Sequence, residues 1–266
     1  MAFSLTWLPQ VLLNAGLKVA ECDGWENRGV AEMGDVFGIL CHHTATPTKQ
    51  GNMPTINTLI NGRSDLPGPL AQLGLGRDGT YYIVAAGKCN HAGAGSWKNI
   101  TSGNTHFIGI EAENTGGSDD FPWPAIQLDA YHRGIAAILQ QIGKGAEFCA
   151  GHKEYALPAG RKSDPDFDMD AFRAAVSAIL NNSAPAPNLI PAIEPSVPGQ
   201  TAGRATLRRG LNNDPALVEI VQRRVGVPAD GVFGPGTEAA IRAFQSASGA
   251  VPDGIIGPKT WASIDA

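Results

Sequence analysis

The sequence lacks any hydrophobic run that approaches the roughly 18 residues of a membrane span. It also lacks an excess of basic residues, because the formal net charge is -5 and the pI lies near 5.7. A basic face is needed to hold phosphate backbones, so this charge argues against nucleic acid as the main partner. With 43% hydrophobic and 17% charged residues, the composition is that of an ordinary soluble globular protein.

The N-terminus lacks the basic region and the unbroken apolar stretch of a secretion signal, since Pro9 interrupts it. Helical spacing is present instead in the apolar residues Leu8, Val11, Leu12 and Ala15. With Thr6 as a helix cap and Gly16 as a stop, we expect a short amphipathic helix. We therefore expect the protein to stay in the cytoplasm until another factor releases it.

Cysteine is scarce and scattered, at Cys22, Cys41, Cys89 and Cys149, with no C-x-x-C pair. Without a secretion signal, we expect four reduced and mostly buried thiols. A disulfide or a thiolate ligand to a metal remains an alternative. Cys41 precedes His42, but adjacent residues of a strand point to opposite faces, which disfavours both binding one metal.

A stretch dense in Pro, Ala and Ser, residues 183–203, has no periodicity and predicts a semi-rigid spacer. The length of 266 residues also suggests one domain of middling size and a smaller one. We therefore predict a first domain over residues 1–182, a Pro/Ala-rich linker over 183–203 and a second domain over 204–266.

The larger part mixes strand and helix patterns. Strand-like runs rich in β-branched or aromatic residues occupy Phe37–Thr44, Tyr81–Ala85 and Phe107–Glu113. Apolar stripes at helical spacing run through Gln127–Ile142 and Met169–Leu180. These patterns predict an α/β domain with a central mixed β-sheet flanked by helices.

The smaller part contains an internal repeat. The segment DGVFGPGT at Asp230–Thr237 recurs as DGIIGPKT at Asp253–Thr260, and each Gly-Pro is followed by a helix-starting Thr. Apolar residues at helical spacing precede the first copy (Leu217, Ile220, Val221, Val225) and follow it (Ala240, Ile241, Phe244). We predict a small three-helix domain whose helices are joined by Asp-Gly turns.

Two histidines, an aspartate and a lysine suggest a metal-dependent chemistry. His42 ends the apolar run Phe37–Cys41, and a loop that His152 opens runs through Lys162 to Asp164. Two neutral imidazoles and one carboxylate can fill three corners of a tetrahedron around Zn²⁺ and leave the fourth for water. Three protein ligands instead of four are typical of a catalytic zinc site.

The repeat over residues 204–266 closely resembles the common peptidoglycan-binding domain of cell-wall hydrolases. The larger part resembles the zinc N-acetylmuramoyl-L-alanine amidases, which share their fold with peptidoglycan-recognition proteins. The matching pieces occur in the family's order: ILCHHTAT (39–46), GRDGTYYIV (76–84), CNHAG (89–93), FIGIEAEN (107–114), GHKEY (151–155) and GRKSDP (160–165). The resemblance implies cleavage of the amide between the lactyl group of N-acetylmuramic acid and L-alanine.

The same resemblance implies a zinc ligand set of His42, His152 and Asp164. The family motif places the metal on the first of the two adjacent histidines, although His43 is the alternative. At the position of Asp164 the family uses either Asp or Cys. His91, in the His-Ala-Gly piece, matches a position that contacts substrate or steadies the transition state in relatives, and we assign it to substrate binding.

Two further residues carry the predicted catalysis. Glu111 has apolar neighbours along its strand, which can raise its pKa toward neutrality for work as a general base. Glu113 lies on the same face by parity and is the alternative. Lys162 lies two residues before Asp164, so in an extended loop its ammonium can approach the oxyanion. Some relatives use a tyrosine for the proton transfer, where this chain has Ala71.

We predict a peptidoglycan amidase of the phage endolysin type, with Zn²⁺ as cofactor, targeted to the wall by its C-terminal domain. Its partner is bacterial peptidoglycan, without nucleic acid or membrane insertion, and we expect a monomer that waits in the host cytoplasm until a holin opens the membrane. The alternatives are a host amidase that recycles soluble muropeptides and a non-catalytic peptidoglycan receptor.

Overall fold

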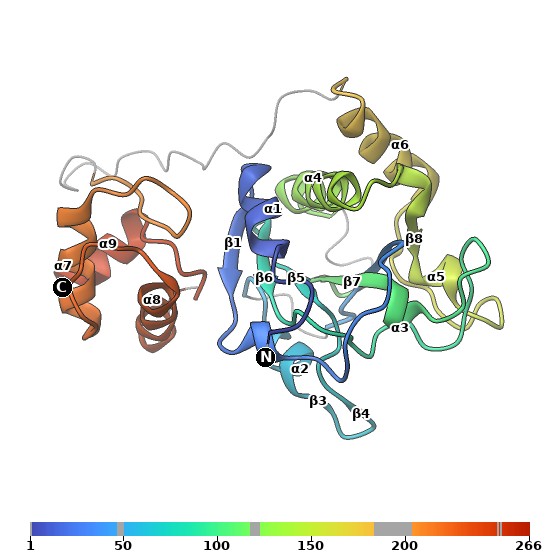
Figure 1. Cartoon of the computed structure of the whole chain (residues 1–266), viewed down its shortest axis with the longest axis horizontal. Helices are drawn as coiled ribbons and strands as arrows, with labels where there is room; N and C mark the ends of the chain where they lie inside the picture. The colour runs from blue at the N-terminus through green and yellow to red at the C-terminus, as the bar shows by residue number, and fades with distance from the viewer. Residues whose placement is uncertain (1, 47–50, 118–122, 184–203, 249, 251) are drawn as a thin grey trace. The chain divides into compact units, whose positions relative to one another are not determined.

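The computed structural model describes residues 2–46, 51–117, 123–183, 204–248, 250 and 252–266 (Figure 1). The chain divides into two compact units, Met1–Lys18 with Gly24–Leu189, and Ile190–Ala266 with Val19–Asp23. Apart from Ser183, the predicted linker 183–203 lies outside the described residues, so the domain boundaries stay a prediction. In the part of the chain that is described, no helix is both long and apolar enough to cross a bilayer.

A mixed six-stranded sheet, five of whose strands lie wholly within the larger unit, forms the centre of that unit, as the sequence patterns predicted. The strand order is β1-β6-β5-β7-β2-β8, with β5 antiparallel to β6 and β7 parallel to both β5 and β2. The strands are β1 (Lys18–Glu21), β2 (Gly38–His43), β5 (Leu73–Leu75), β6 (Thr80–Ile83), β7 (Phe107–Ala112) and β8 (Cys149–Gly151). A separate hairpin pairs β3 (Gly62–Arg63) with β4 (Leu66–Pro67).

Three helices lie along one face of this sheet: α1 (Leu8–Asn14), α4 (Ala125–Gln141) and α6 (Met169–Leu180) (Figure 1). Helix α4 contacts both of the others. Shorter helical segments complete the unit, namely α2 (Ile56–Asn61), α3 (Gly103–His106), α5 (His152–Tyr155) and the 3-10 turns Trp25–Asn27 and Ala146–Phe148. The predicted helices Gln127–Ile142 and Met169–Leu180 are therefore confirmed to within a turn.

The predicted N-terminal helix forms, but its predicted cap is wrong. The helix begins at Leu8 with Trp7 at the cap position, and no side chain caps it. Pro9 lies in the first turn, where its missing N–H costs nothing and its fixed φ suits the helix, so the start does not depend on Thr6. Gly16 ends the helical segment as predicted, with a φ of 77° that glycine adopts readily.

Helix α4 packs closely on the sheet because of one glycine. The predicted stripe residues Tyr131, Ile135 and Leu139 are all fully buried. A side chain at Gly134 would place its Cβ 2.2 Å from the hydroxyl oxygen of Tyr81 on β6. Only glycine permits this approach of helix to strand.

The pairing of β2 with β7 determines which side chains meet. His42 pairs with Glu111 and Leu40 with Gly109, and residues paired in parallel strands point to the same face. Leu40 packs there against Ala92 and Tyr155 in an apolar cluster. His42 and Glu111 therefore extend from the carboxyl ends of adjacent strands, the edge at which sheets of this kind usually bind ligands.

The described residues of the smaller unit contain three helices, as predicted: α7 (Pro215–Val225), α8 (Pro235–Ala247) and α9 (Pro258–Asp265). Each has proline in its first turn. The predicted apolar face of α7 is partly wrong, because Ile220 is 38% exposed while Val218 and Gln222 are buried. The core consists of Leu207, Val218, Val221, Phe233, Ile241, Ile256, Trp261 and Ile264.

Two buried glutamines explain the repeated motif. The side-chain amide nitrogen of Gln222 lies 2.7 Å from Asp230 Oδ1 and 3.0 Å from Thr237 Oγ1, and its oxygen accepts the N–H of Gly231. Gln245, one repeat later, makes the same set of bonds with Asp253 (2.8 Å), Thr260 (3.2 Å) and Gly254 (2.9 Å). The Asp, Gly and Thr of each copy thus hydrogen-bond to a glutamine of the preceding helix, and these bonds hold the turn against that helix.

We expect Gln245→Leu to lower the free energy of unfolding of the smaller unit by on the order of 2 kcal/mol, because it leaves the Gly254 N–H and its neighbours without their partner. Hydrogen exchange of α8 and α9 in the full chain measures this as lost protection. Ser246→Ala, at the exposed next position of the same helix, is the matched control. Equal protection in both variants would contradict this role of the glutamine.

Candidate metal centre

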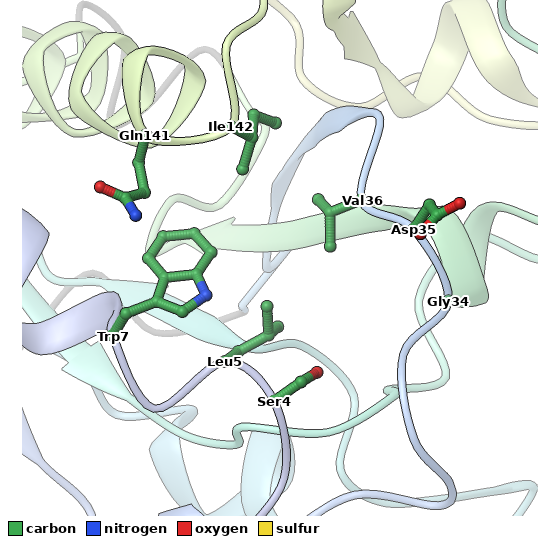
Figure 2. Close-up of a pocket in the computed structure, with 8 residues that line it drawn as sticks. All are labelled: Ser4, Leu5, Trp7, Gly34, Asp35, Val36, Gln141 and Ile142. Atoms are coloured by element: carbon green, nitrogen blue, oxygen red, sulfur yellow. The ribbon is translucent and has the colours of Figure 1, made fainter.

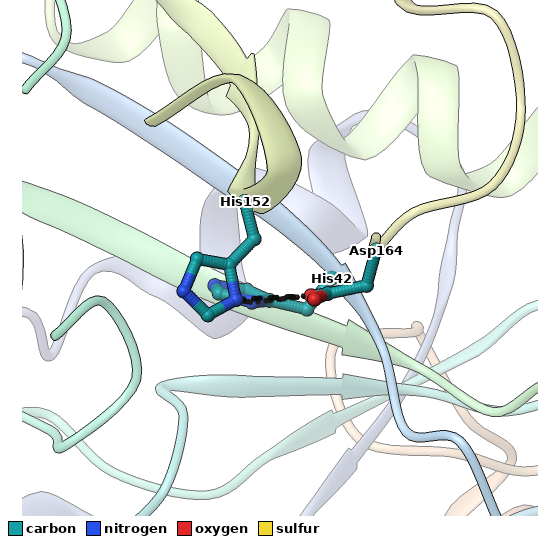
Figure 3. Close-up of side chains that lie close together, drawn as sticks. All are labelled: His42, His152 and Asp164. Atoms are coloured by element: carbon teal, nitrogen blue, oxygen red, sulfur yellow. Dashed lines mark hydrogen bonds and ion pairs between the residues drawn. The ribbon is translucent and has the colours of Figure 1, made fainter. Parts of the chain in front are cut away.

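Three of the predicted site residues converge at the end of β2. His42 comes from the strand, His152 from the first turn of α5 and Asp164 from the loop before α6 (Figure 3). His42 Nδ1 lies 3.0 Å from His152 Nδ1, and each of these nitrogens lies 3.1 Å from Asp164 Oδ2. The structure thus brings together residues that are more than a hundred positions apart in the chain.

The chemistry of these donors fits a tetrahedral metal ion. Bonds of about 2.0 Å at a tetrahedral zinc place the ligand atoms about 3.3 Å apart, close to the separations seen here. His152 Nε2 lies 3.0 Å from the carbonyl oxygen of Ala92, which can only accept, so this nitrogen carries the proton. The lone pair on Nδ1 therefore faces His42 and Asp164. Nitrogen lone pairs and a negatively charged carboxylate repel one another at this distance, and a cation bound between them would remove that repulsion.

The structure distinguishes the two adjacent histidines. His42 belongs to the converging group, whose ligand atoms all lie within 4.8 Å of one another. His43 points to the other face of β2, where its Nδ1 lies 3.6 Å from Asp166 and its ring lies 6.2 Å from that of Trp123. This is the alternation that strand geometry requires.

The cysteines are buried as free thiols, as predicted. Cys41 lies on the strand beside His42, but its Sγ is 3.3 Å from Sγ of Cys149 on the neighbouring strand β8. Neither belongs to the group of converging ligand atoms. Among the described residues, the structure therefore places a carboxylate and no thiolate beside the two imidazoles.

Electrostatics keep His42 and Asp164, two of the candidate ligands, in the forms that bind a metal. Burial lowers the pKa of His42 to about 4, so its imidazole is neutral at pH 7. Burial alone would raise the pKa of Asp164, but hydrogen bonds with His152 and His42 outweigh it and hold that pKa well below its usual range. A neutral imidazole and an ionised carboxylate are species that coordinate zinc.

Glu111 and Glu113 have different surroundings. Glu111 Oε1 lies 4.0 Å from His42 Nδ1, and Oε2 is buried with no hydrogen-bond partner among the described residues. Burial, and next the charge of Asp164, raise the pKa of Glu111 to about 8. The carboxylate of Glu113 instead accepts from Thr44 Oγ1 at 3.0 Å and from Thr55 Oγ1 at 2.5 Å. Of the two, only Glu111 has an oxygen free beside the ligands.

The other two predicted site residues lie at different depths. Lys162 is exposed on the loop before Asp164, and its charge is among the causes that lower the pKa of Glu111. His91 is 8% exposed, and its Nδ1 lies 3.1 Å from His42 Nε2. Its Nε2 lies 3.2 Å from the carbonyl oxygen of Phe107. Both ring nitrogens of His91 are therefore engaged within the protein.

Sequence patterns missed two residues that support the site. The hydroxyl of Tyr131 on α4 accepts the backbone N–H of His42 at 3.0 Å and lies 3.0 Å from the carbonyl oxygen of Ile110. The sequence offered one signal for Tyr131, because its hydroxyl is a polar group within an otherwise apolar helical stripe and needs a buried partner. Asn104 accepts the backbone N–H groups of both His91 and Ala92, and no local pattern marked it.

A surface hollow of about 300 Å³ lies away from these residues (Figure 2). Val36, two residues before β2 begins, and Ile142, just after α4, are among the residues on its wall, with the indole of Trp7. The remaining lining residues are Ser4, Leu5, Gly34, Asp35 and Gln141. It therefore lies at the start of β2, whereas His42 lies near the end, and it includes none of the predicted site residues.

Comparison with protein families agrees with the resemblance drawn from the motifs. The model described as N-acetylmuramoyl-L-alanine amidase matches residues 32–167, about half of the chain. A peptidoglycan binding domain matches residues 218–264. The chain belongs to the N-acetylmuramoyl-L-alanine amidase family and carries a peptidoglycan-binding domain. Among curated proteins, none matches its sequence.

Several solved structures are similar to part of the chain. A selenomethionine derivative of AmpD is 20% identical, with 66% of this chain and 99% of that chain covered and a TM-score of 0.47. The hydrolase AmiA of Staphylococcus aureus, in complex with its ligand, is 18% identical over 69% of this chain and 96% of its own, with a TM-score of 0.46. The Ph2119 endolysin of a Thermus scotoductus bacteriophage is 18% identical over 59% and 98%, with a TM-score of 0.42.

Proposed function

We propose that this peptidoglycan amidase is a zinc enzyme that cleaves the bond between N-acetylmuramic acid and L-alanine. The observation that carries the proposal is the convergence of His42 Nδ1, His152 Nδ1 and Asp164 Oδ2 within hydrogen-bonding distance of one another. These three residues would hold Zn²⁺ and leave one coordination position for a small molecule. When bound, the ion would lower the pKa of a water molecule to roughly 7 and polarise the scissile carbonyl.

Glu111 is the proposed general base. An amide is hydrolysed only if the attacking water loses a proton and the departing nitrogen gains one. Glu111 Oε1 lies near the ligand atoms, and Oε2 has no partner among the described residues, so the carboxylate is available for both transfers. Burial and the charge of Asp164 raise the pKa of Glu111, which makes its carboxylate a stronger base toward water. Ala71 is fully buried and has no hydroxyl for this role.

Lys162 is the proposed stabiliser of the developing negative charge on the carbonyl oxygen. It is exposed on the loop that delivers Asp164, and its charge acts on both Glu111 and His42. A lysine on a loop can approach the oxygen when substrate arrives, since its four-carbon side chain is flexible. Its removal would slow the chemical step without changing the metal ligands.

We infer a role as a phage endolysin from the pairing of the two domains. A weak wall-binding domain linked to a hydrolase raises the effective concentration of the enzyme at an insoluble polymer. A host enzyme that recycles soluble muropeptides would gain nothing from such a domain. A non-catalytic receptor would have no use for three ligands together with a perturbed carboxylate.

The test is digestion of purified cell walls by the full chain, followed by mass spectrometry of the products. We expect stem peptides that begin with a free L-alanine amino group and glycan strands that keep the lactyl group. New reducing sugar ends, or cleavage within the stem peptide, would contradict the proposed bond. If no amino groups are released, the chain is a receptor.

A comparison of two substrates separates the remaining alternatives. We expect faster cleavage of intact sacculi than of soluble anhydromuropeptides at equal bond concentration, because only sacculi engage the binding domain repeatedly. A preference for soluble fragments would indicate a recycling enzyme.

A further inference from the structure

A single dipeptide contacts the outer side of both proposed imidazole ligands. The Nε2 of His42 lies 3.1 Å from His91 Nδ1, and the Nε2 of His152 lies 3.0 Å from the carbonyl oxygen of Ala92. In each ligand the opposite ring nitrogen, Nδ1, faces Asp164 (Figure 3). His91 and Ala92 are adjacent, so a shift of this one segment would disturb both ligands.

The contacts of this segment also determine where the ring protons lie. A carbonyl oxygen only accepts, so Nε2 of His91 carries a proton and donates to Phe107. In the tautomer that donates from Nε2, the other ring nitrogen of His91, Nδ1, carries a lone pair and accepts. His91 Nδ1 therefore accepts a hydrogen bond from the N–H at His42 Nε2. The other ring nitrogen of His42, Nδ1, is left with a lone pair. His152 reaches the same state through Ala92.

Asn104 holds the segment in place. Its Oδ1 accepts the backbone N–H of His91 at 2.9 Å and that of Ala92 at 2.7 Å. Asn104 lies in α3, which leads directly into β7, the strand that carries Glu111. One side-chain oxygen thus links both metal ligands to the strand of the proposed base.

The strand itself is shaped to receive the His91 ring. A Cβ on Gly109 would lie 2.7 Å from both Cγ and Nδ1 of His91, closer than such atoms approach one another. Glycine at this position of β7 lets the His91 ring pack directly on the strand backbone, where it contacts His42 Nε2. The packing therefore leaves little freedom for the segment once Asn104 fixes its backbone.

We propose that Asn104 is a positioning residue of the metal centre, which acts through His91 and Ala92 on the orientation and tautomer of His42 and His152. This inference rests on the proposed zinc site. It gives His91 a role in positioning His42, and the substrate contact that the family resemblance implied for His91 stays a prediction. Removal of residues that orient metal ligands without touching the metal typically weakens metal affinity by 10- to 100-fold.

The test is the zinc dissociation constant of the full chain, measured by competition with a chromophoric chelator. We expect Asn104→Ala to weaken zinc binding roughly 10- to 100-fold. Asn104→Asp keeps an oxygen that accepts both N–H groups, and we expect it to restore most of the affinity. The visible spectrum of the Co²⁺-substituted protein should shift in Asn104→Ala and return toward that of the wild type in Asn104→Asp.

The matched control is Asn90→Ala, in the residue next to the segment. Asn90 donates from Nδ2 to the carbonyl oxygen of Pro67 and contacts neither imidazole ligand through its side chain. We expect its zinc affinity and cobalt spectrum to equal those of the wild type. An Asn104→Ala protein that binds zinc as tightly as the wild type would overturn the proposal.

If Asn104→Ala does not fold, His91→Gln provides a second test, because it breaks the connection from His42 to Phe107 and keeps a side chain of similar length. Unchanged zinc affinity in that variant would also overturn the proposal. Failure of the wild-type protein to bind zinc is a different result, because it contradicts the proposed zinc enzyme itself.

Discussion

We expect His42→Gln to abolish the proposed zinc binding and to lower kcat/KM for wall digestion by roughly 10³-fold or more, since a bound metal supplies several kcal/mol of transition-state stabilisation. The variant keeps a side chain of similar size in a fully buried strand, so we expect the fold to be preserved. The two remaining ligands, His152 and Asp164, cannot hold the ion at the same affinity. Metal analysis after dialysis and the rate of turbidity loss of wall suspensions measure both effects.

The neighbouring histidine is the matched control for this experiment. His43 is equally part of β2 but points to the opposite face, toward Asp166 and Trp123. We expect His43→Gln to retain zinc and most of the activity. Treatment of the wild type with a strong chelator should reproduce the loss seen in His42→Gln, and added zinc should reverse it. Full lysis after complete removal of the metal would contradict the proposed chemistry.

We expect Glu111→Gln to lower kcat by roughly 10²- to 10⁴-fold, the range that a positioned general base contributes, and to leave the proposed zinc binding unchanged. The amide is isosteric but cannot take a proton from water. Glu113→Gln is the matched control, because that carboxylate is occupied by hydrogen bonds from Thr44 and Thr55. We expect it to reduce stability more than kcat. Equal losses of kcat in the two variants would remove the distinction between the two glutamates.

The pH dependence of kcat/KM also tests Glu111 as the general base. Burial and the charge of Asp164 raise the pKa of Glu111 from 4.5 to about 8 in the metal-free protein, and a bound cation lowers it again. A general base works only when ionised, so activity falls as the pH drops through this pKa. We expect an acidic limb with a midpoint between 4.5 and 8 in the wild type and its disappearance in Glu111→Gln. A limb that persists in the variant belongs to another group.

Much of the fold could be predicted because its patterns are local. The apolar runs of β2, β6 and β7 and the stripes of α4 and α6 depend on residues close together in the chain. The short strands β5 and β8 were missed, because three residues carry too little periodicity to be recognised. The face of α7 was misjudged at Ile220, since the buried polar side chain of Gln222 replaces an apolar residue in the stripe.

The metal ligands of the candidate site could be predicted from sequence motifs, whereas the choice of base and the supporting contacts depend on the folded structure. The family resemblance placed the metal on the first histidine of the pair, and the structure brings His42 rather than His43 to His152 and Asp164. The choice between Glu111 and Glu113 required knowledge of which carboxylate is already hydrogen-bonded, and parity does not give this. The support that Asn104 gives to His91 and Ala92 crosses from one loop to another, so no spacing in the sequence could reveal it.

The most direct test of the account is X-ray absorption at the zinc edge of the loaded full chain. The proposed ligand set predicts two imidazole rings and light-atom ligands only, all at about 2.0 Å, with no sulfur neighbour. A sulfur at about 2.3 Å, which would implicate Cys41 or Cys149, or a first coordination shell without imidazole, would contradict it.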